Sequence, residues 1–330
     1  MAGYKEKKTS LAEKIFPAKG DSKGEAIRKI VVLIAFAVLV VSLIILISYF
    51  AQHARTKADI EQQREQHTSV ITITQVTTAP VTESETTETE PPPLVVLPSM
   101  ESFLAENPDT AGWITIPGTN VDNVVVQAAD NDYYLSRDFN GNKNAAGQIY
   151  VDFRCIINDY EENQSDNIVV YGHNQADGTM FGTLKKYKIK KESTKNFDFY
   201  LENPTFTFSN LYEEYTYKII ALFVIEVEPY QTRDGYIFDY HNFVNFGKTK
   251  RKFSDFKENV LARTAVNTGV DFDENDKYMT LSTCSNEFEP SRFVVIGRRV
   301  RDGESPEVNV SLAEINTDML EPDYNYIYSR

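Results

Sequence analysis

The sequence predicts an all-β domain, either a barrel or a sandwich, behind a single N-terminal transmembrane helix. Three observations support this prediction. Residues 30–50 form an uncharged apolar run, eight short β-rich runs recur after residue 100, and only the segment 254–266 shows helical spacing among them. The 330 residues allow one or two domains, and two cysteines are too few for a disulfide scaffold.

The uncharged run at residues 30–50 is predicted to cross a membrane. Its 21 residues, at about 1.5 Å each, reach the roughly 30 Å of a bilayer core. The run is longer than the apolar core of a secretory signal peptide, and no small-residue cleavage motif follows it, which favours a retained anchor. Eight Lys and Arg against four acidic residues in the first 50 place residues 1–29 in the cytoplasm and everything after the run outside.

The net charge divides at the same point of the chain. The whole protein carries −14, but its first 50 residues carry +4 and the remainder carries −18. Binding to nucleic acid needs a clustered basic face, so this balance argues against a nucleic-acid partner.

Residues 51–99 are predicted to connect the anchor to the folded domain. Residues 51–67 have a helix-forming composition and are expected to extend the anchor as a short polar helix. Residues 68–93 are rich in Thr, Glu and Pro and contain too little apolar surface to fold, which is typical of an extended stalk.

The folded domain is predicted to span residues 100–302. Pro-Gly and Asn-Gly turn signals separate its β-rich runs, and the helix at 254–266 lies between the sixth and seventh of them. The acidic segment 303–330 ends in three tyrosines and is compatible with a loose tail or with a packed terminal segment. The eight runs are residues 113–117, 123–127, 147–153, 167–171, 205–208, 215–227, 278–282 and 293–298.

Few side chains of this domain suit catalysis. Of four histidines, His53 and His67 fall in the stalk region, which leaves His173 and His241. A zinc site needs three or four clustered ligands, and no such spacing occurs, so neither a metal nor a cofactor is expected. His173 ends a β-run after Gly172, which allows a sharp turn. A histidine at such a strand end is either a structural residue or a catalytic one.

The two cysteines have different surroundings. Cys284 ends a β-run, and Arg292 opens the next run eight residues later. A strand, a short loop and a second strand would place both side chains on neighbouring strand ends, where a fixed cation favours a thiolate and can donate to an oxyanion. Cys155 lacks such surroundings and is interpreted as an ordinary thiol. A Cys155–Cys284 disulfide is the alternative, and it would consume the nucleophile. Cys, His and a fixed donor are the minimum set for acyl transfer.

Three motifs carry a family resemblance: TLSTC at 280–284, Arg292 with the VVIGRR that follows, and YGHN at 171–174. In this combination they resemble the sortases, the cysteine transpeptidases of Gram-positive surfaces. A block at residues 107–154 also matches, so the resemblance covers about residues 100–300. TLSTC, the DGTMFGTLKKY sequence after the histidine and the helix before the catalytic strand are similar to class B.

The resemblance implies a closed eight-stranded sortase β-barrel with N-terminal helices packed outside and one helix inserted before the catalytic strand. It implies Cys284 as nucleophile, His173 as general acid and base, and Arg292 as the donor to the oxyanion or the substrate. Ser285 stands where some class B members have an acidic residue, which leaves the subsites open. The resemblance implies a peptide groove lined by Asn131, Leu135, Thr232, Tyr236, Ile237 and Ser282.

The resemblance also implies partners and location. A class B sortase cleaves a C-terminal sorting signal after Thr and joins the surface protein, through a thioacyl-enzyme, to an amino group of a peptidoglycan precursor. The catalytic domain would lie outside the cell membrane. Two alternatives stay open: a pilin-linking sortase with a Lys acceptor, and a non-catalytic anchored module that binds wall peptides. The Asp-Pro-aromatic lid of the pilin class is missing from the sequence, and binding alone needs no Cys/His/Arg set.

Overall fold

The computed structural model describes residues 11–77, 93–190, 196–246 and 252–329. The chain divides between Thr56 and Lys57 into two compact units. The α-helices are α1 (Leu11–Ile15), α2 (Lys23–Thr77), α3 (Pro98–Glu106), α4 (Phe197–Glu202), α5 (Phe253–Arg263) and α6 (Tyr324–Tyr328). Short 3-10 helices are η1 (Tyr134–Ser136), η2 (Leu184–Tyr187), η3 (Pro229–Gln231), η4 (Tyr240–Asn242) and η5 (Val310–Leu312).

Helix α2 contains the predicted anchor and is longer than expected. Its segment Lys23–Ile71 is long and apolar enough, by length and composition, to cross a membrane. The helix continues to Thr77, ten residues into the segment 68–93 that was expected to be an extended stalk. Residues 78–92, which form most of that predicted stalk, lie outside the described residues.

Within the second unit, residues 60–67 of α2 pack against β1 (Thr110–Thr115) and the turn that leads into β2 (Asp122–Val126). Ile60 is buried, and the ring of His67 stacks on that of Trp113 at 4.0 Å between centroids. The Arg64 guanidinium donates to the backbone oxygens of Asp122 at 2.8 Å and Asn120 at 2.6 Å. Tertiary packing of this kind stabilises the polar part of α2 that follows the apolar run.

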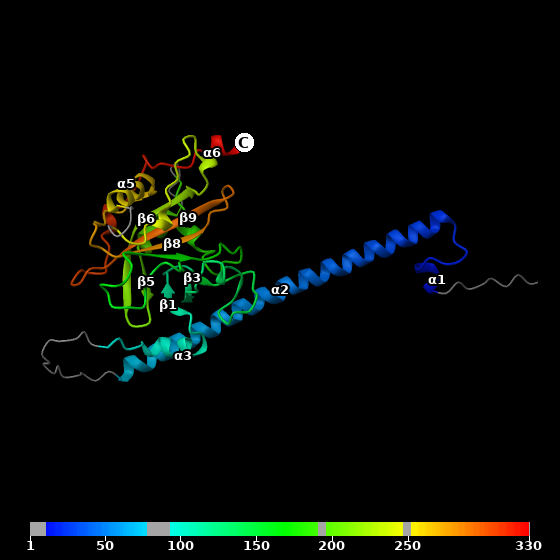
Figure 1. Cartoon of the computed structure of the whole chain (residues 1–330), viewed down its shortest axis with the longest axis horizontal. Helices are drawn as coiled ribbons and strands as arrows, with labels where there is room; N and C mark the ends of the chain where they lie inside the picture. The colour runs from blue at the N-terminus through cyan, green and yellow to red at the C-terminus, as the bar shows by residue number, and fades with distance from the viewer. Residues whose placement is uncertain (1–10, 78–92, 191–195, 247–251, 330) are drawn as a thin grey trace, which may run out of the picture. The chain divides into compact units, whose positions relative to one another are not determined.

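Eight strands close into one barrel in the order β1-β2-β3-β4-β8-β9-β6-β5 (Figure 1). Each predicted β-run overlaps one barrel strand, and the predicted closed barrel is confirmed. The pairs β2/β3 and β4/β8 are parallel, and the other pairs are antiparallel. The strands are β1 (Thr110–Thr115), β2 (Asp122–Val126), β3 (Ile149–Val151), β4 (Asn167–Tyr171), β5 (Thr205–Ser209), β6 (Glu214–Glu226), β8 (Tyr278–Cys284) and β9 (Ser291–Arg299).

Strands β6 and β9 are apolar on both faces because each face is covered. Leu222 of β6 belongs to the core inside the barrel, and its neighbour Phe223 belongs to a second core with Phe256 and Val260 of α5. Figure 1 shows α5 beside β6. Successive side chains of a strand point to opposite faces, so a strand covered on both sides has a continuous apolar sequence.

Helix α5 ends three residues before the predicted boundary at residue 266. The N–H of Ala265 donates to the Leu222 oxygen at 2.8 Å, which draws the chain onto β6. Val266 then begins β7 (Val266–Asn267), which pairs with β10 (Glu314–Ile315) from the C-terminal segment.

The C-terminal segment is packed, which decides between the two alternatives predicted for it. After β10, the Asn316 N–H donates to the Ala265 oxygen at 3.0 Å and the Leu320 N–H donates to the Ala262 oxygen at 2.7 Å. Met319 is buried and packs in one hydrophobic cluster with Ala265 and Val266. The segment therefore follows the end of α5 across the outside of the domain.

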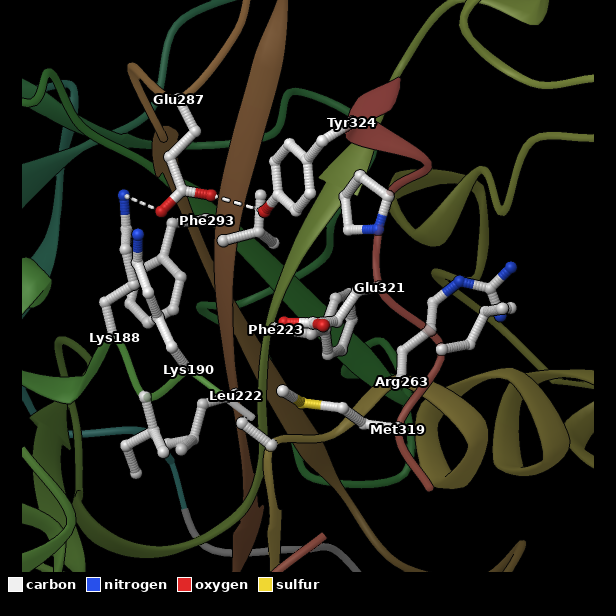
Figure 2. A pocket seen from close by; sticks show the side chains of 15 residues that line it. Lys188, Lys190, Leu222, Phe223, Arg263, Glu287, Phe293, Met319, Glu321 and Tyr324 are labelled. Atoms are coloured by element: carbon white, nitrogen blue, oxygen red, sulfur yellow. Dashed lines mark hydrogen bonds and ion pairs between the residues drawn. The ribbon is translucent and has the colours of Figure 1, made fainter. Parts of the chain in front are cut away.

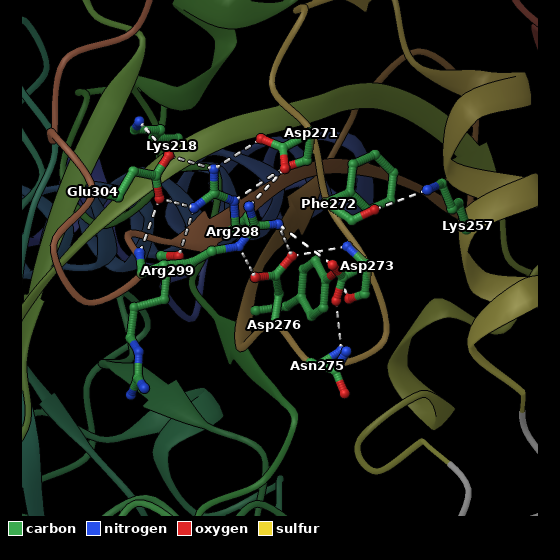
Figure 3. Close-up of polar contacts among 12 residues, drawn as sticks. Lys218, Lys257, Asp271, Phe272, Asp273, Asn275, Asp276, Arg298, Arg299 and Glu304 are labelled. Carbon is green, nitrogen blue, oxygen red and sulfur yellow. Dashed lines mark hydrogen bonds and ion pairs between the residues drawn. The ribbon is translucent and has the colours of Figure 1, made fainter.

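A charged cluster surrounds the C-terminal end of β9 (Figure 3). Arg298 is completely buried and forms ion pairs with Glu304 and with Asp271. Lys218 also pairs with Glu304, at 2.6 Å, and Arg301 pairs with Asp276 at the same distance. Hydrogen bonds from Arg298 hold the pKa of Glu304 well below its usual range. At this end of β9, the buried charge of Arg298 is therefore compensated by two carboxylates.

Candidate active site

Cys284 and Arg292 are direct partners across the β8–β9 hairpin. Cys284 is the last residue of β8, and the antiparallel register places it opposite Arg292 near the start of β9. Both side chains are half-buried. Directly opposed residues have Cβ atoms about 5 Å apart, so the guanidinium can reach the space in front of the thiol. The expectation that the two lie on neighbouring strand ends agrees with this register.

His173 lies beside Cys284 because β4 runs parallel to β8. Tyr171, the last residue of β4, pairs with Ser282 of β8. His173 lies two residues after Tyr171 and Cys284 lies two residues after Ser282, so the register places His173 and Cys284 at the same level. The Asn174 amide donates to the backbone oxygen of Cys284 at 2.8 Å and ties the histidine loop to the cysteine strand. The parallel register thus brings together two residues that lie far apart in the sequence.

The imidazole of His173 is held by a carbonyl group. Its Nε2 lies 2.7 Å from the backbone oxygen of Leu135. A carbonyl oxygen only accepts, so Nε2 carries the proton in this contact. Gly147 packs against the ring with φ +61°, and a Cβ at this position would lie 2.9 Å from Cδ2 of His173 and 2.8 Å from the Leu135 oxygen. Only glycine leaves room for the histidine here.

The second cysteine is buried and inert by comparison. Cys155 is 5% exposed, and its Sγ accepts from the N–H of Val169 at 3.4 Å. Burial raises the pKa of its thiol to about 12, so almost no thiolate forms at neutral pH. Both cysteines are free thiols, and the alternative of a Cys155–Cys284 disulfide is wrong.

Buried tyrosines form the wall behind the nucleophile. Burial, together with Asp132 and Asp152, raises the pKa of Tyr150 to about 12, and the nearby Arg292 acts against this shift. Tyr240 is completely enclosed, and its hydroxyl shares a 2.7 Å hydrogen bond with Ser282. Neutral phenols at these positions give the site a rigid wall that carries no charge at neutral pH.

Asp152 is a buried acid that the sequence did not reveal. Its side chain is fully buried; burial alone would raise its pKa, but hydrogen bonds from Arg154 and Tyr171 lower the pKa below its usual value. Asn131 donates to the same carboxylate at 3.1 Å, and its amide oxygen accepts from the Phe153 N–H. Asn131, predicted for the peptide groove, is therefore engaged in this network.

The remaining predicted groove residues fall into two sets. Ser282 and Leu135 contact the catalytic surroundings directly, Ser282 through Tyr240 and Leu135 through His173. The others, Thr232, Tyr236 and Ile237, lie on the loop after η3. Tyr236 is 53% exposed, and its hydroxyl donates to Asn259 of α5 at 3.1 Å. Their role in substrate binding stays a prediction.

Two functional contacts were absent from the sequence prediction. Asn174 stood in the YGHN motif without a role, and only the parallel β4/β8 register shows its bond to Cys284. Lys188 donates to the backbone oxygen of Ser285 at 2.7 Å and to its hydroxyl at 3.0 Å. Nothing in the local pattern around Lys188 signals this contact. Among the described residues, no group of three or more His, Cys, Asp or Glu side chains could hold a metal ion.

Comparison with known proteins identifies the family. A family model described as the sortase domain matches residues 114–300, more than half of the chain. The chain belongs to the sortase family. It is 33% identical over 196 residues to sortase B of Listeria monocytogenes, covering 59% of this chain and 71% of that protein. It is 29% identical over 209 residues to sortase B of Staphylococcus aureus, covering 62% and 76%.

Solved structures agree with this sortase fold. The S. aureus sortase B–substrate complex matches with a TM-score of 0.58 at 24% identity, covering 76% of this chain and 98% of the other. A mutant form of Clostridium perfringens sortase B matches with a TM-score of 0.51 at 29% identity, covering 62% and 87%. The relatives place this sortase in class B. Its C-terminal segment, residues 303–330, lies beyond the matched family domain.

Proposed function

We propose that this sortase is a membrane-anchored cysteine transpeptidase that attaches surface proteins to the cell wall. One observation carries the proposal: Cys284 and Arg292 face each other across a hairpin, and His173 follows the end of β4, which runs beside β8. A thiol, an imidazole and a fixed cation on one barrel rim are the parts that acyl transfer needs. The family to which the chain belongs consists of cysteine transpeptidases.

In the first half-reaction, the Cys284 thiolate attacks the backbone carbonyl carbon of the Thr in a C-terminal sorting signal. A carbon–sulfur bond forms, and Arg292 stabilises the oxyanion. The N–H of Ser285, next to the nucleophile, already donates to the Ser291 oxygen at 3.1 Å, which supports Arg292 as the main donor. The imidazolium of His173 then gives its proton to the departing amine as the peptide bond breaks.

In the second half-reaction, an amine of a peptidoglycan precursor attacks the thioester. Neutral His173 accepts the proton that the amine loses, and the carbon–sulfur bond breaks to regenerate the Cys284 thiolate. Nε2 of His173 is held on Leu135, so Nδ1 is the ring nitrogen that this arrangement leaves for proton transfer. The surface protein ends joined to the wall by a new amide bond.

The charge pattern supports an orientation for the anchor. Residues 30–50 would span the membrane, the basic segment 1–29 would lie in the cytoplasm, and residues 51–99 would connect the anchor to a catalytic domain outside. This places Cys284 on the side where sorting signals and wall precursors meet. The segment 303–330 would also lie outside.

Turnover by the full chain in detergent micelles tests the proposed reaction. Peptides of the patterns NPxTN and (S/P)PxTG are incubated with enzyme and with diaminopimelate or a short glycine peptide as amine. We expect cleavage after Thr and a product whose mass equals the acyl fragment plus the amine. Joining only to a Lys side chain of a pilin peptide would favour the pilin-linking alternative. Binding without cleavage across the panel would favour the non-catalytic module.

A further inference from the structure

The C-terminal segment makes specific contacts with two loops that flank the candidate site. We call residues 314–328, from β10 to α6, the strap. One loop is the turn 285–290, which joins β8 to β9 directly after Cys284. The other is the loop 227–239, which follows β6 and carries the three groove candidates Thr232, Tyr236 and Ile237.

The first contact joins the strap to the turn 285–290. The Tyr324 hydroxyl donates to the Glu287 carboxylate at 2.7 Å, and the Tyr328 hydroxyl donates to the Glu287 backbone oxygen. The ring of Tyr324 also packs edge-on against Phe288 at 5.9 Å between centroids. Figure 2 shows Glu287 between Tyr324 on one side and Lys188 on the other.

Lys188 continues this contact toward the nucleophile. Its ammonium group lies 3.6 Å from the Glu287 carboxylate and donates to the backbone oxygen of Ser285 at 2.7 Å. Burial lowers the pKa of Lys188, and Glu287 acts in the opposite direction. A chain of polar contacts thus runs from Tyr324 through Glu287 and Lys188 to the residue that follows Cys284.

The second contact joins the strap to the loop 227–239. The Arg233 guanidinium pairs with Asp323 at 2.7 Å and lies over the Tyr326 ring at 5.0 Å. Asp323 also accepts from the N–H of Tyr326 at 3.0 Å. It therefore caps the start of α6 and also binds the loop 227–239. Hydrogen bonds from the Tyr326 N–H and from Arg233 lower the pKa of the Asp323 carboxyl, which keeps it charged.

The space beneath the strap is too small for an organic ligand. A cavity of about 30 Å³ lies between the strap and the β6–β9 sheet, lined in part by Leu222, Met319 and Glu321. Ligand sites usually need several hundred Å³. The role of the strap is therefore sought in its contacts with the turn 285–290 and the loop 227–239, and not in a ligand bound beneath it.

We propose that the strap positions the substrate groove: Tyr324 and Asp323 hold the turn 285–290 and the loop 227–239 in one fixed arrangement. This inference rests on the proposed function, because the groove is that of the sorting peptide. Two loops held in place before binding lose less conformational entropy when a peptide is bound. Asp323 and Tyr324 are thus positioning residues, and their loss should weaken peptide binding more than it slows the chemical steps.

Two point variants separate the two contacts in the full chain in micelles. Tyr324→Phe removes the hydroxyl and keeps the ring, so it should loosen the turn 285–290, which Tyr328 still contacts, and leave the loop 227–239 unchanged. Asp323→Asn weakens the pair with Arg233 and keeps an acceptor for the Tyr326 N–H, so it should release only the loop 227–239. Termination after Pro322 should release both. Tyr215→Phe is the matched control, because it loses a phenol–carboxylate bond to Glu213 at the far end of β6.

Hydrogen exchange by mass spectrometry and peptide kinetics give the two measurements. Because a hydrogen bond to a charged group is stabilising, we expect exchange about threefold to tenfold faster in the released loop only. We expect KM for the peptide to rise by a similar factor, about threefold to tenfold, with kcat within about twofold. Tyr215→Phe should change neither quantity.

The outcomes distinguish the strap from the proposed function. Unchanged exchange in both loops after termination at Pro322 overturns the strap, whatever the enzyme does to peptides. A threefold to tenfold fall in kcat with unchanged KM also overturns the strap proposal, because a positioning role acts on peptide binding. The wild-type chain could cleave no peptide while each variant still speeds hydrogen exchange in its own loop. In that case the proposed reaction fails, and the inference that the strap holds the two loops stands.

Discussion

The two ends of β9 each carry an arginine, and the two side chains have opposite surroundings. Arg298 is fully buried and paired with Glu304 and Asp271. Arg292 is half-buried, its guanidinium donates to the Ser291 oxygen at 3.0 Å, and among the described residues no carboxylate lies within ion-pair distance of it. The same side chain on one strand thus stabilises the domain where its charge is satisfied and is available for chemistry where it is not.

The largest expected effect is the difference between substituting Cys284, which lies opposite Arg292, and substituting Cys155. Cys284→Ala should abolish transpeptidation, because no other described thiol lies at the catalytic end of the barrel. Cys155→Ala should leave kcat within a few-fold, because its thiol is buried with a pKa raised to about 12. Steady-state peptide kinetics check both. Equal damage from the two substitutions would show that the nucleophile is wrongly assigned.

Removing the catalytic arginine should come next in size. Arg292→Ala should lower kcat about 10²- to 10³-fold, the usual result of losing one oxyanion donor. Its thermal unfolding temperature should stay close to that of the wild type, since no ion pair is lost among the described residues. Kinetics and a thermal melt on the same sample provide the check. A large loss of stability would mean that Arg292 serves the fold instead.

The structural arginine should show the reverse behaviour. Arg298→Met should lower the free energy of unfolding by about 1–2 kcal/mol, because the Arg298 hydrogen bonds to Glu304 and to the backbone oxygens of Asp271 and Arg299 are lost. The activity per folded molecule should fall by less than about tenfold, since the change lies at the other end of β9. Denaturant unfolding and peptide kinetics measure the two effects. An unchanged stability would remove the contrast between the two ends.

The smallest expected effect is a dependence on pH. The folded pKa of Glu304 lies below its unfolded value because Arg298 and Lys218 bond to the carboxylate. Its contribution to stability is therefore complete above the unfolded pKa, about 4.5, and is lost as pH falls below that value toward the folded pKa. Thermal melts of wild type and Glu304→Gln from pH 7 to pH 3 should converge in acid. A constant difference between them would argue against the ion pair.

Local patterns predicted the strands well but left a barrel and a sandwich open, and only the family resemblance implied a closed barrel. Each barrel strand carries its own β-branched or aromatic run, and turn residues separate the runs, so existence and order of the strands follow from nearby sequence. The catalytic residues were equally visible, because Cys284 ends its run, Arg292 opens the next one and His173 follows a third. What made them a site was the parallel β4/β8 register, which no local pattern specifies.

The parts that were not predicted depend on contacts between distant segments. His67 was assigned to the stalk region, and its stacking on Trp113 cannot be deduced from a polar helix alone. The sequence around Tyr324 is compatible with a loose or a packed tail, and only the pairing of β10 with β7 brings Tyr324 to Glu287. In both cases an aromatic residue in a polar segment was the one available signal.

Trapping the acyl-enzyme tests the central claim most directly. The full chain in micelles is incubated with a cleavable sorting peptide without an acceptor amine, quenched in acid, digested and mapped by mass spectrometry. The account predicts the acyl fragment ending in Thr on Cys284 and on no other residue, with less of it formed in Arg292→Ala than in Arg298→Met. An acyl group on Cys155, or cleaved peptide with no thioester at any time point, would contradict it.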